Sequence, residues 1–325
     1  MSRPAATGKV EVTTLGMGGA PLGNLFSSVS DDDAQSAVEA AWLGGVRYFD
    51  TAPHYGLGLS ERRFASALSN YPRAEFAIST KVGRLLRPNP HPRGSDLEGG
   101  AFAVPDTESR VLDYSPVGVR RSIEESLERL QMDFIDIAYV HDPDNHLEQV
   151  AKETLPALAE LRDEGLIGAI GVGMNYWQPL LEFVQSCSLD VVMVAGRWTL
   201  LDRSGEVLLN ACAERGVCVV AAAPFNSGVL AQHEVAPTAH FDYAPATPHV
   251  ITRVRDLAGL CSDFGVTLPH AALQFPLRHR AVVSVVAGFR GAGEARSATQ
   301  WMSTPVPQEL WTAIDEYHTT KGALA

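Results

Sequence analysis

Five polar residues are placed along the sequence so that they could form a proton-transfer site. Asp50, Lys81, His141 and Asn175 each stand where an apolar run ends, and Tyr55 follows Asp50 by one short loop. A lysine at the end of an apolar strand needs a partner of opposite charge, so we expect Asp50 to pair with Lys81. An ammonium group at ~4 Å should lower the pKa of a phenol by about three units. We therefore predict that Tyr55 exchanges a proton near neutral pH, while His141 orients a substrate oxygen.

The elements that must position these residues alternate between apolar strands and helices. Strands are expected at 15–18, 47–50, 76–81, 134–140, 169–173, 191–195, 217–223 and 282–287. Such continuous apolar strands are typical of parallel sheets, which are buried on both faces. Eight strand–helix units predict one (β/α)8 TIM barrel domain over 1–325, with its site at the carboxyl ends of the strands. A doubly wound open sheet is the alternative, but no glycine-rich dinucleotide motif follows an early strand.

Helices are expected after most of these strands. Their predicted ranges are 30–43, 60–68, 115–130, 149–164, 179–185, 206–215, 250–264, a short helix near 294, and 307–321. Two segments lie outside this alternation. Residues 9–15 predict a short N-terminal hairpin. Residues 85–114, after the third strand, are too long and too rich in Pro and Gly for an ordinary connection, so this loop is either a functional lid or disordered.

Composition excludes several classes of partner. The net charge of −12 argues against nucleic acid or an anionic membrane as the main partner. The cysteines form no C-x-x-C pair, so we expect reduced thiols and no metal site. The acids after His141 indicate a turn around Pro143 rather than a metal centre. With no apolar run long enough to span a membrane and no secretory signal, a cytoplasmic protein is expected.

Asp50, Tyr55, Lys81 and His141 resemble the catalytic tetrad of the aldo-keto reductase superfamily. The neighbouring motifs agree in register with that family, at 45–52, 79–81, 136–141 and 165–175. The last of these resembles a family strand that ends in a serine–asparagine pair, with Met174 in place of the serine. The resemblance implies a nicotinamide cofactor bound in extended form at the carboxyl face of the barrel.

The resemblance also implies roles for individual residues. Tyr55 would be the acid–base, Asp50 and Lys81 would tune it, and His141 would position the reacting oxygen. Asn175 would hold the nicotinamide carboxamide. The further residues expected at the cofactor are Pro224, Phe225, Asn226, Ser227, Gly228, Leu230, Gly288, Arg290 and Glu294. His54 and Trp198 are expected in the substrate pocket, and Ala222 replaces a tyrosine that stacks on the nicotinamide in the family.

Finer similarity narrows the expected reaction. Segments 81–86, 195–201 and 223–230 resemble the subgroup of D-threo-aldose 1-dehydrogenase, L-fucose dehydrogenase and pyridoxal 4-dehydrogenase. This implies a small-molecule substrate, an aldose being oxidised at C1 to the lactone with Tyr55 as base. The alternatives are a pyridoxal 4-dehydrogenase, an NADPH-dependent aldehyde or ketone reductase, a Schiff-base enzyme that uses Lys81, and a non-catalytic cofactor-sensing subunit.

The same resemblance bears on the choice of cofactor. Glu294 takes the position at which NADP-preferring relatives carry an arginine, and an acid there repels a 2′-phosphate but accepts from a ribose hydroxyl. NAD is therefore predicted as the preferred cofactor. NADP is the alternative, through Arg290 or Arg296. The sequence leaves the oligomeric state open.

Overall fold

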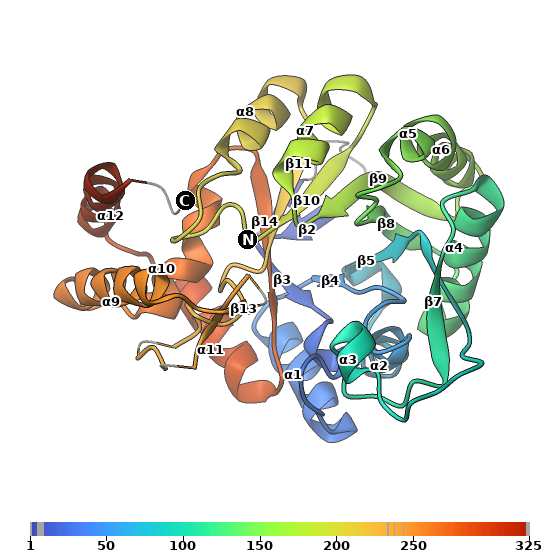
Figure 1. Ribbon diagram of the computed structural model, residues 1–325, viewed down its shortest axis with the longest axis horizontal. Coiled ribbons are helices and arrows are strands. Elements are labelled where there is room, and N and C mark those ends of the chain that lie inside the picture. The colour runs from blue at the N-terminus through green and yellow to red at the C-terminus, as the bar shows by residue number, and fades with distance from the viewer. Residues whose placement is uncertain (1, 5–9, 233, 237, 243, 323–325) are drawn as a thin grey trace.

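Eight parallel strands close into a barrel at the centre of the protein, and helices surround it (Figure 1). The computed structural model describes residues 2–4, 10–232, 234–236, 238–242 and 244–322. In order around the barrel the strands are β3 (Leu15–Gly18), β4 (Tyr48–Asp50), β5 (Ala77–Val82), β8 (Ile135–His141), β9 (Ile167–Met174), β10 (Val191–Ala195), β11 (Cys218–Ala222) and β14 (Val282–Gly288). The predicted (β/α)8 barrel is confirmed, and each strand lies within two residues of its expected bounds.

The helices begin where capping residues satisfy their first N–H groups. Ser30 accepts from Asp33 N before α1, and Ser115 accepts from Gly118 N before α4. The longer helices are α1 (Asp31–Leu43), α2 (Leu59–Leu68), α4 (Pro116–Leu130), α6 (Leu155–Asp163), α7 (Trp177–Ser186), α8 (Glu206–Arg215), α9 (Pro248–Asp263), α11 (Ala292–Ser303) and α12 (Gln308–Lys321). A short α5 (Leu147–Gln149) and a π-helical turn at Val150–Thr154 precede α6. The sequence did not indicate α10 (Leu268–Gln274), whose residues are mostly buried and so lack an amphipathic pattern.

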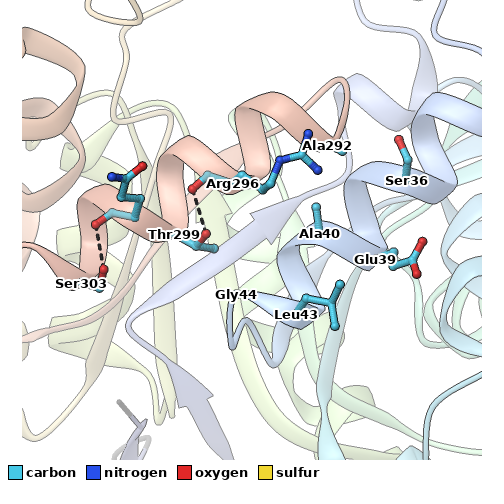
Figure 2. A pocket seen from close by; sticks show the side chains of 10 residues that line it. Ser36, Glu39, Ala40, Leu43, Gly44, Ala292, Arg296, Thr299 and Ser303 are labelled. Carbon is cyan, nitrogen blue, oxygen red and sulfur yellow. Dashed lines mark hydrogen bonds between the residues drawn. The ribbon is translucent and has the colours of Figure 1, made fainter.

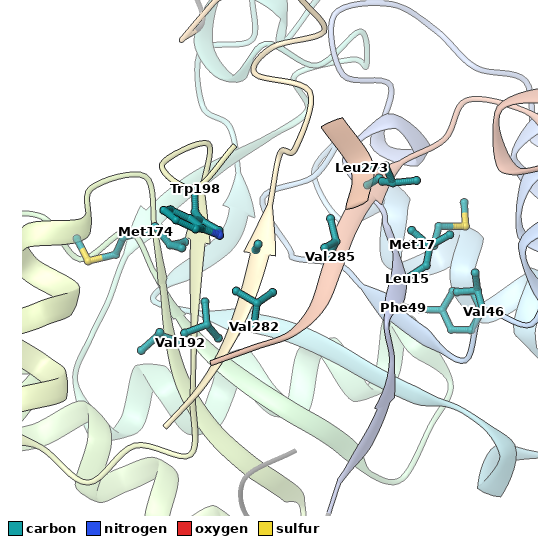
Figure 3. Packing of buried hydrophobic residues seen from close by; sticks show 14 of the residues in the cluster. Leu15, Met17, Val46, Phe49, Met174, Val192, Trp198, Leu273, Val282 and Val285 are labelled. Carbon is teal, nitrogen blue, oxygen red and sulfur yellow. The ribbon is translucent and has the colours of Figure 1, made fainter. Parts of the chain in front are cut away.

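Two apolar layers follow from the alternation of side chains along the barrel strands. Phe49 faces the helices, whereas its neighbour Tyr48 points into the barrel. Figure 3 shows the outer layer, in which strand residues such as Val192 and Val285 pack between the sheet and the helices. The inner layer fills the barrel itself. Residues two apart on a strand therefore share one face, which points either toward the helices or into the barrel.

The N-terminal hairpin differs from its prediction. β1 (Ser2–Pro4) pairs with β2 (Glu11–Thr13), so only the second arm lies within 9–15, and Lys9 lies outside the described residues. Val10 and Val12 are buried in the inner layer, while Glu11 between them is exposed. This arm therefore covers the amino end of the barrel with its apolar face.

The long segment after β5 is an ordered hairpin. β6 (Arg84–Pro88) pairs antiparallel with β7 (Glu108–Leu112), and a short α3 (Leu97–Gly100) lies between them. A separate apolar cluster of Leu57, Leu86, Phe102 and Val104 joins this hairpin to the loop that follows β4. Of the two expectations for the segment, the structure excludes disorder. A second small hairpin pairs β12 (His240–Phe241) with β13 (Ala244–Pro245).

A buried ion pair connects α2 to its neighbours. Glu61, on α2, is completely buried; it accepts from the Thr80 hydroxyl at 2.7 Å and pairs with the Arg129 guanidinium. These partners lie on β5 and α4. A buried carboxylate is tolerated only when its oxygens are paired in this way. Glu61 therefore fixes α2 against the strand that carries Lys81.

We expect Glu61→Ala to lower the free energy of unfolding by about 3 kcal/mol, because it leaves the buried Thr80 hydroxyl without its acceptor and the partly buried Arg129 without its nearest carboxylate. Urea unfolding followed by circular dichroism measures the change. The matched control is Glu148→Ala, which breaks a solvent-exposed pair with Lys152 and should leave the unfolding midpoint unchanged. Equal losses in the two variants would contradict this assignment.

Candidate active site

Three of the predicted residues lie together at the carboxyl ends of β4 and β5 and in the loop that follows β4. Lys81 Nζ lies 2.8 Å from Asp50 Oδ2 and 3.0 Å from the Tyr55 hydroxyl. It also donates to Thr51 O at 2.9 Å. Lys81 is only 2% exposed and Asp50 3%. The expected pairing of Asp50 with Lys81 is therefore present, and all three donors of the ammonium group have acceptors.

Further polar residues lie beneath this cluster inside the barrel. Ser79 donates to Asp50 Oδ1 at 2.7 Å, and the Tyr48 hydroxyl lies 3.0 Å from the Ser79 hydroxyl. The Tyr139 hydroxyl is 3.3 Å from that of Tyr48. Sequence reasoning missed these three residues. Each stands two positions before a predicted site residue on the same strand, and that spacing was the signal that they share its face.

Aromatic rings pack around the ring of Tyr55. The ring of His141 lies 5.9 Å from that of Tyr55 and 5.5 Å from that of His54, in edge-on arrangements. Phe102, from the hairpin after β5, contacts His54 at 5.3 Å and Tyr55 at 6.0 Å between ring centroids. The structure thus places His54 beside the predicted tetrad, and its role as a wall of the substrate pocket stays a prediction. Phe102 was not predicted, because no local pattern links it to this site.

The backbone after Tyr55 is fixed by a close approach between two loops. Gly56 has a left-handed φ of 63°, and a Cβ there would lie 2.2 Å from Gly23 O. Only glycine fits this position. Tyr55 is therefore held by its neighbour as well as by Lys81.

The predicted lowering of the Tyr55 pKa is wrong in sign. Burial raises the pKa of Tyr55 above its usual value, and the Lys81 ammonium opposes this rise without overcoming it. The expectation counted the attraction to the ammonium but left out the cost of removing water from a phenolate. Burial is the largest single effect on Lys81 and acts to lower its pKa, but Asp50 and Tyr55 together outweigh it and the net shift is upward. Lys81 thus stays charged, which argues against a Schiff-base role.

Both histidines of the cluster are neutral at physiological pH. Burial, followed by the charge of Arg84, lowers the pKa of His141 well below its usual value. The same causes lower the pKa of His54 to about 2. A neutral imidazole can donate one hydrogen bond and accept another. His141 can therefore orient an oxygen without carrying charge.

The loop after β11 has features that suit a bound dinucleotide. Asn226 is 5% exposed and donates to Gly196 O, whereas its Oδ1 atom is buried and has no partner among the described residues. Ala223, Asn226, Ser227 and Gly228 all have left-handed φ values. The backbone N–H groups of Asn226 and Gly228 donate to carbonyl oxygens within the loop, so the unpartnered Oδ1 of Asn226 is the feature that could meet a cofactor group.

Other residues predicted at the cofactor are placed as follows. Pro224 lies in the same loop, Phe225 packs partly against the outer core, and the side chain of Leu230 is completely buried. Only the backbone of Leu230 could therefore reach a ligand. Gly288 ends β14 beside Gly18 of β3. The backbone O of Asn175 accepts from Arg197 at 2.9 Å.

Arg290 and Glu294 are tied to the loop that carries them. The guanidinium of Arg290 donates to the backbone oxygens of Leu25, Ser27 and Ser28, at 3.1–3.2 Å. Its backbone N donates to Glu294 Oε2 at 2.8 Å. This guanidinium is thus already engaged by carbonyl groups. Arg296 instead lines a groove between α1 and α11 together with Glu39 and Leu43 (Figure 2).

Trp198 makes the contacts of a core residue. It is 8% exposed, its indole N–H donates to Pro276 O at 3.2 Å, and its ring packs against Phe275 and His279. These partners precede β14 and lie outside the cluster around Tyr55. The structure gives Trp198 a packing role, and its predicted place in the substrate pocket stays a prediction.

Three structural observations concern other classes of site. No helix in the described ranges is long and apolar enough to cross a membrane. The described residues contain no group of three or more His, Cys, Asp or Glu side chains that could hold a metal ion. The four cysteines are all free thiols.

Comparison with known proteins gives one consistent result. The model of the Aldo/keto reductase family matches residues 14–318. The chain is 44% identical to D-threo-aldose 1-dehydrogenase from Pseudomonas sp., covering 96% of each chain. It is 39% identical to pyridoxal 4-dehydrogenase from Microbacterium luteolum, covering 93% of each, and 30% identical to L-galactose dehydrogenase from Arabidopsis thaliana, covering 94% of this chain and 90% of the relative.

Solved structures share the fold at lower identity. An aldo-keto reductase from Bacillus halodurans in its holo form superposes with a TM-score of 0.77 at 24% identity, over 97% of this chain and 95% of the other. A glycerol dehydrogenase from Gluconobacter oxydans gives a TM-score of 0.78 at 20% identity, over 96% and 93%. These similarities concern the fold.

We expect the phenol of Tyr55 to titrate above the usual range of a tyrosine, and Lys81→Met to raise its pKa further by removing the opposing charge. Ultraviolet titration of the protein minus that of Tyr55→Phe isolates this group. Lys152→Met, which removes a surface ammonium, should leave the curve unchanged. Titration of Tyr55 near neutral pH would contradict the raised pKa and support the lowered pKa predicted from the sequence.

Proposed function

Because the chain belongs to the aldo/keto reductase family of NAD(P)-dependent oxidoreductases, we propose that it oxidises an aldose at C1 to the lactone, with NAD as the preferred cofactor. One observation carries this proposal: Tyr55 contacts a buried Lys81 that is held by Asp50, beside a neutral His141. The similarity to D-threo-aldose 1-dehydrogenase supports an aldose as the substrate.

The four residues have separate roles in this proposal. The nicotinamide ring of the cofactor supplies the acceptor for the hydride of C1. Tyr55 receives the proton of the C1 hydroxyl, and Lys81, 3.0 Å away, stabilises the phenolate that must first form. Asp50 keeps Lys81 charged and in place. His141 donates a hydrogen bond to the reacting oxygen. Because burial raises the pKa of Tyr55, oxidation should accelerate as the pH rises.

The residues around the loops after β11 and β14 would hold the cofactor. The buried Oδ1 of Asn226, which has no partner among the described residues, would accept a hydrogen bond from a donor group of the cofactor. Asn175 would hold the carboxamide. Glu294 offers its second carboxylate oxygen to a ribose hydroxyl and repels a 2′-phosphate. Arg290 donates to three backbone carbonyls, which supports NAD over NADP.

A second candidate is oxidation of pyridoxal, supported by the 39% identity to pyridoxal 4-dehydrogenase. NAD reduction measured with L-fucose, D-arabinose, L-galactose, L-glucose and pyridoxal separates the two. A strong preference for NADPH-linked reduction of aldehydes or ketones would contradict both. We further propose that the protein acts in the cytoplasm on this small substrate, in keeping with its acidic charge and free thiols.

Tyr55→Phe should lower kcat for aldose oxidation about 10²- to 10⁴-fold, because it removes the proton acceptor. Steady-state kinetics with NAD measures the loss, and NADH fluorescence should show unchanged binding of the reduced cofactor. Tyr71→Phe is the matched control, since Tyr71 stacks on Trp42 away from the site. Full activity in Tyr55→Phe would instead support a non-catalytic subunit on the same fold.

Glu294→Gln should raise kcat/KM with NADP about fivefold and leave that with NAD nearly unchanged. The amide oxygen still accepts from Arg290 N, so the substitution removes mainly the charge, which contributes about 1 kcal/mol in water. Glu309→Gln, in the first turn of α12, is the control for removing an equivalent exposed charge. If the ratio of kcat/KM with NADP to kcat/KM with NAD is unchanged in Glu294→Gln, the 2′-phosphate binds elsewhere.

A further inference from the structure

An ion pair that the mechanism does not use lies next to His141. Arg84 Nη2 donates to Asp142 Oδ2 at 3.0 Å, and the same carboxylate oxygen lies 3.5 Å from His141 Nε2. Each of the two side chains is 19% exposed. Asp142 follows His141 directly and has a left-handed φ of 41°, a conformation that is rare for residues other than glycine. The pair is therefore partly buried at the edge of the tetrad.

The backbone on both sides of this pair is tightly fixed. Gly83 has a φ of 104°, and a Cβ there would lie 2.2 Å from the ring of Tyr114. The Tyr114 hydroxyl in turn lies 2.9 Å from His141 O and 3.2 Å from Asp142 O, close enough to donate to either. One tyrosine thus packs against the start of β6 and holds the end of β8. Arg84 and Asp142 are consequently set in position before any substrate arrives.

Unpartnered polar atoms gather around the pair. His54 Nδ1, Arg84 Nε, Arg110 Nε and His141 Nδ1 are buried and have no hydrogen-bond partner among the described residues. They belong to one neighbourhood, because the His54 and His141 rings lie 5.5 Å apart and Arg110 donates to His54 O at 2.9 Å. Buried polar groups in native proteins are normally paired, so the unpartnered Nδ1 atoms of the two histidines in particular indicate that a polar ligand completes the site.

The chemistry of the pair limits what that ligand is. A guanidinium beside a carboxylate offers donors and an acceptor together, and a hydroxyl group both donates and accepts. An anion would meet the Asp142 carboxylate, and a cation would meet Arg84 and Arg110. A neutral hydroxyl suits the pair better than either ion.

We propose that Arg84 and Asp142 bind the hydroxyl on the carbon next to the reacting carbon, so that the site selects substrates with a vicinal diol. This rests on the proposed function, in which His141 holds the reacting oxygen. Asp142 Oδ2 lies 3.5 Å from His141 Nε2, so a hydroxyl bound by the pair would lie beside the oxygen held by His141, on the neighbouring carbon. An aldose carries such a hydroxyl at C2.

A purely structural role for the pair can be separated from this one. Arg87 lies on the same strand and pairs with Glu125 of α4, its Nη1 lying 2.9 Å from Oε1. That second ion pair anchors the hairpin to the barrel. It has no contact with the histidine rings, so Arg87→Met is a matched control for losing an arginine from β6.

The test compares D-arabinose with 2-deoxy-D-ribose, which lacks only the C2 hydroxyl. Arg84→Met and Asp142→Asn should each lower kcat/KM for D-arabinose about tenfold to a hundredfold, the range for a hydrogen bond to a charged group. For 2-deoxy-D-ribose the loss should stay below about threefold. Arg84→Lys, which keeps the charge, should recover part of the D-arabinose activity, and Arg87→Met should not discriminate between the sugars.

The outcomes separate the two proposals. Equal losses on both sugars, or the same discrimination in Arg87→Met, would overturn the diol-binding role while leaving aldose oxidation in place. A wild-type protein that oxidises neither sugar would overturn the proposed function and this inference with it. Thermal unfolding of each variant identifies any loss that arises from misfolding, and in that case Arg84→Lys decides the result.

Discussion

The buried contact between Lys81 and Asp50 is the interaction on which the rest of the site depends. An ammonium group inside a barrel is stable only when its charge is matched and each of its donors is used. Asp50, Thr51 O and Tyr55 together meet that requirement. The same requirement explains why polar side chains lie inside the barrel beneath this pair, because Ser79 donates to the other carboxylate oxygen of Asp50. The chemistry proposed for Tyr55 is thus a consequence of how the barrel accommodates one charge.

Burial and the charge of Lys81 shift the pKa of Tyr55 in opposite directions, so both must be weighed. A neighbouring cation favours the phenolate, but the same burial that strengthens this attraction removes the water that would solvate the anion. In this site the second effect is larger, and the phenol is the stable form. His141 follows the same rule, since burial and nearby cations both favour its neutral form. The cluster therefore carries its charge on Lys81 and Asp50 rather than on Tyr55 and His141.

The hairpin after β5 links the site to the outer part of the fold. Its apolar cluster packs on the Tyr55 loop, Phe102 covers His54, and Arg84 reaches the end of β8. The segment that the sequence left open between lid and disorder is an ordered hairpin packed against the Tyr55 loop. Side chains from one hairpin therefore contact His54, Tyr55 and Asp142.

The sequence by itself predicted the barrel, its strand positions and the residues proposed as the tetrad, because apolar runs and the residues that end them are local patterns read along one chain. The period of two on each strand also contained the inner residues Tyr48, Ser79 and Tyr139. Only the tertiary structure decided that the Arg290 guanidinium is engaged by carbonyl groups, that Trp198 packs in the core, and that Arg84 meets Asp142. The partners in those contacts lie far apart in sequence, so distance and burial, which no local pattern records, select them.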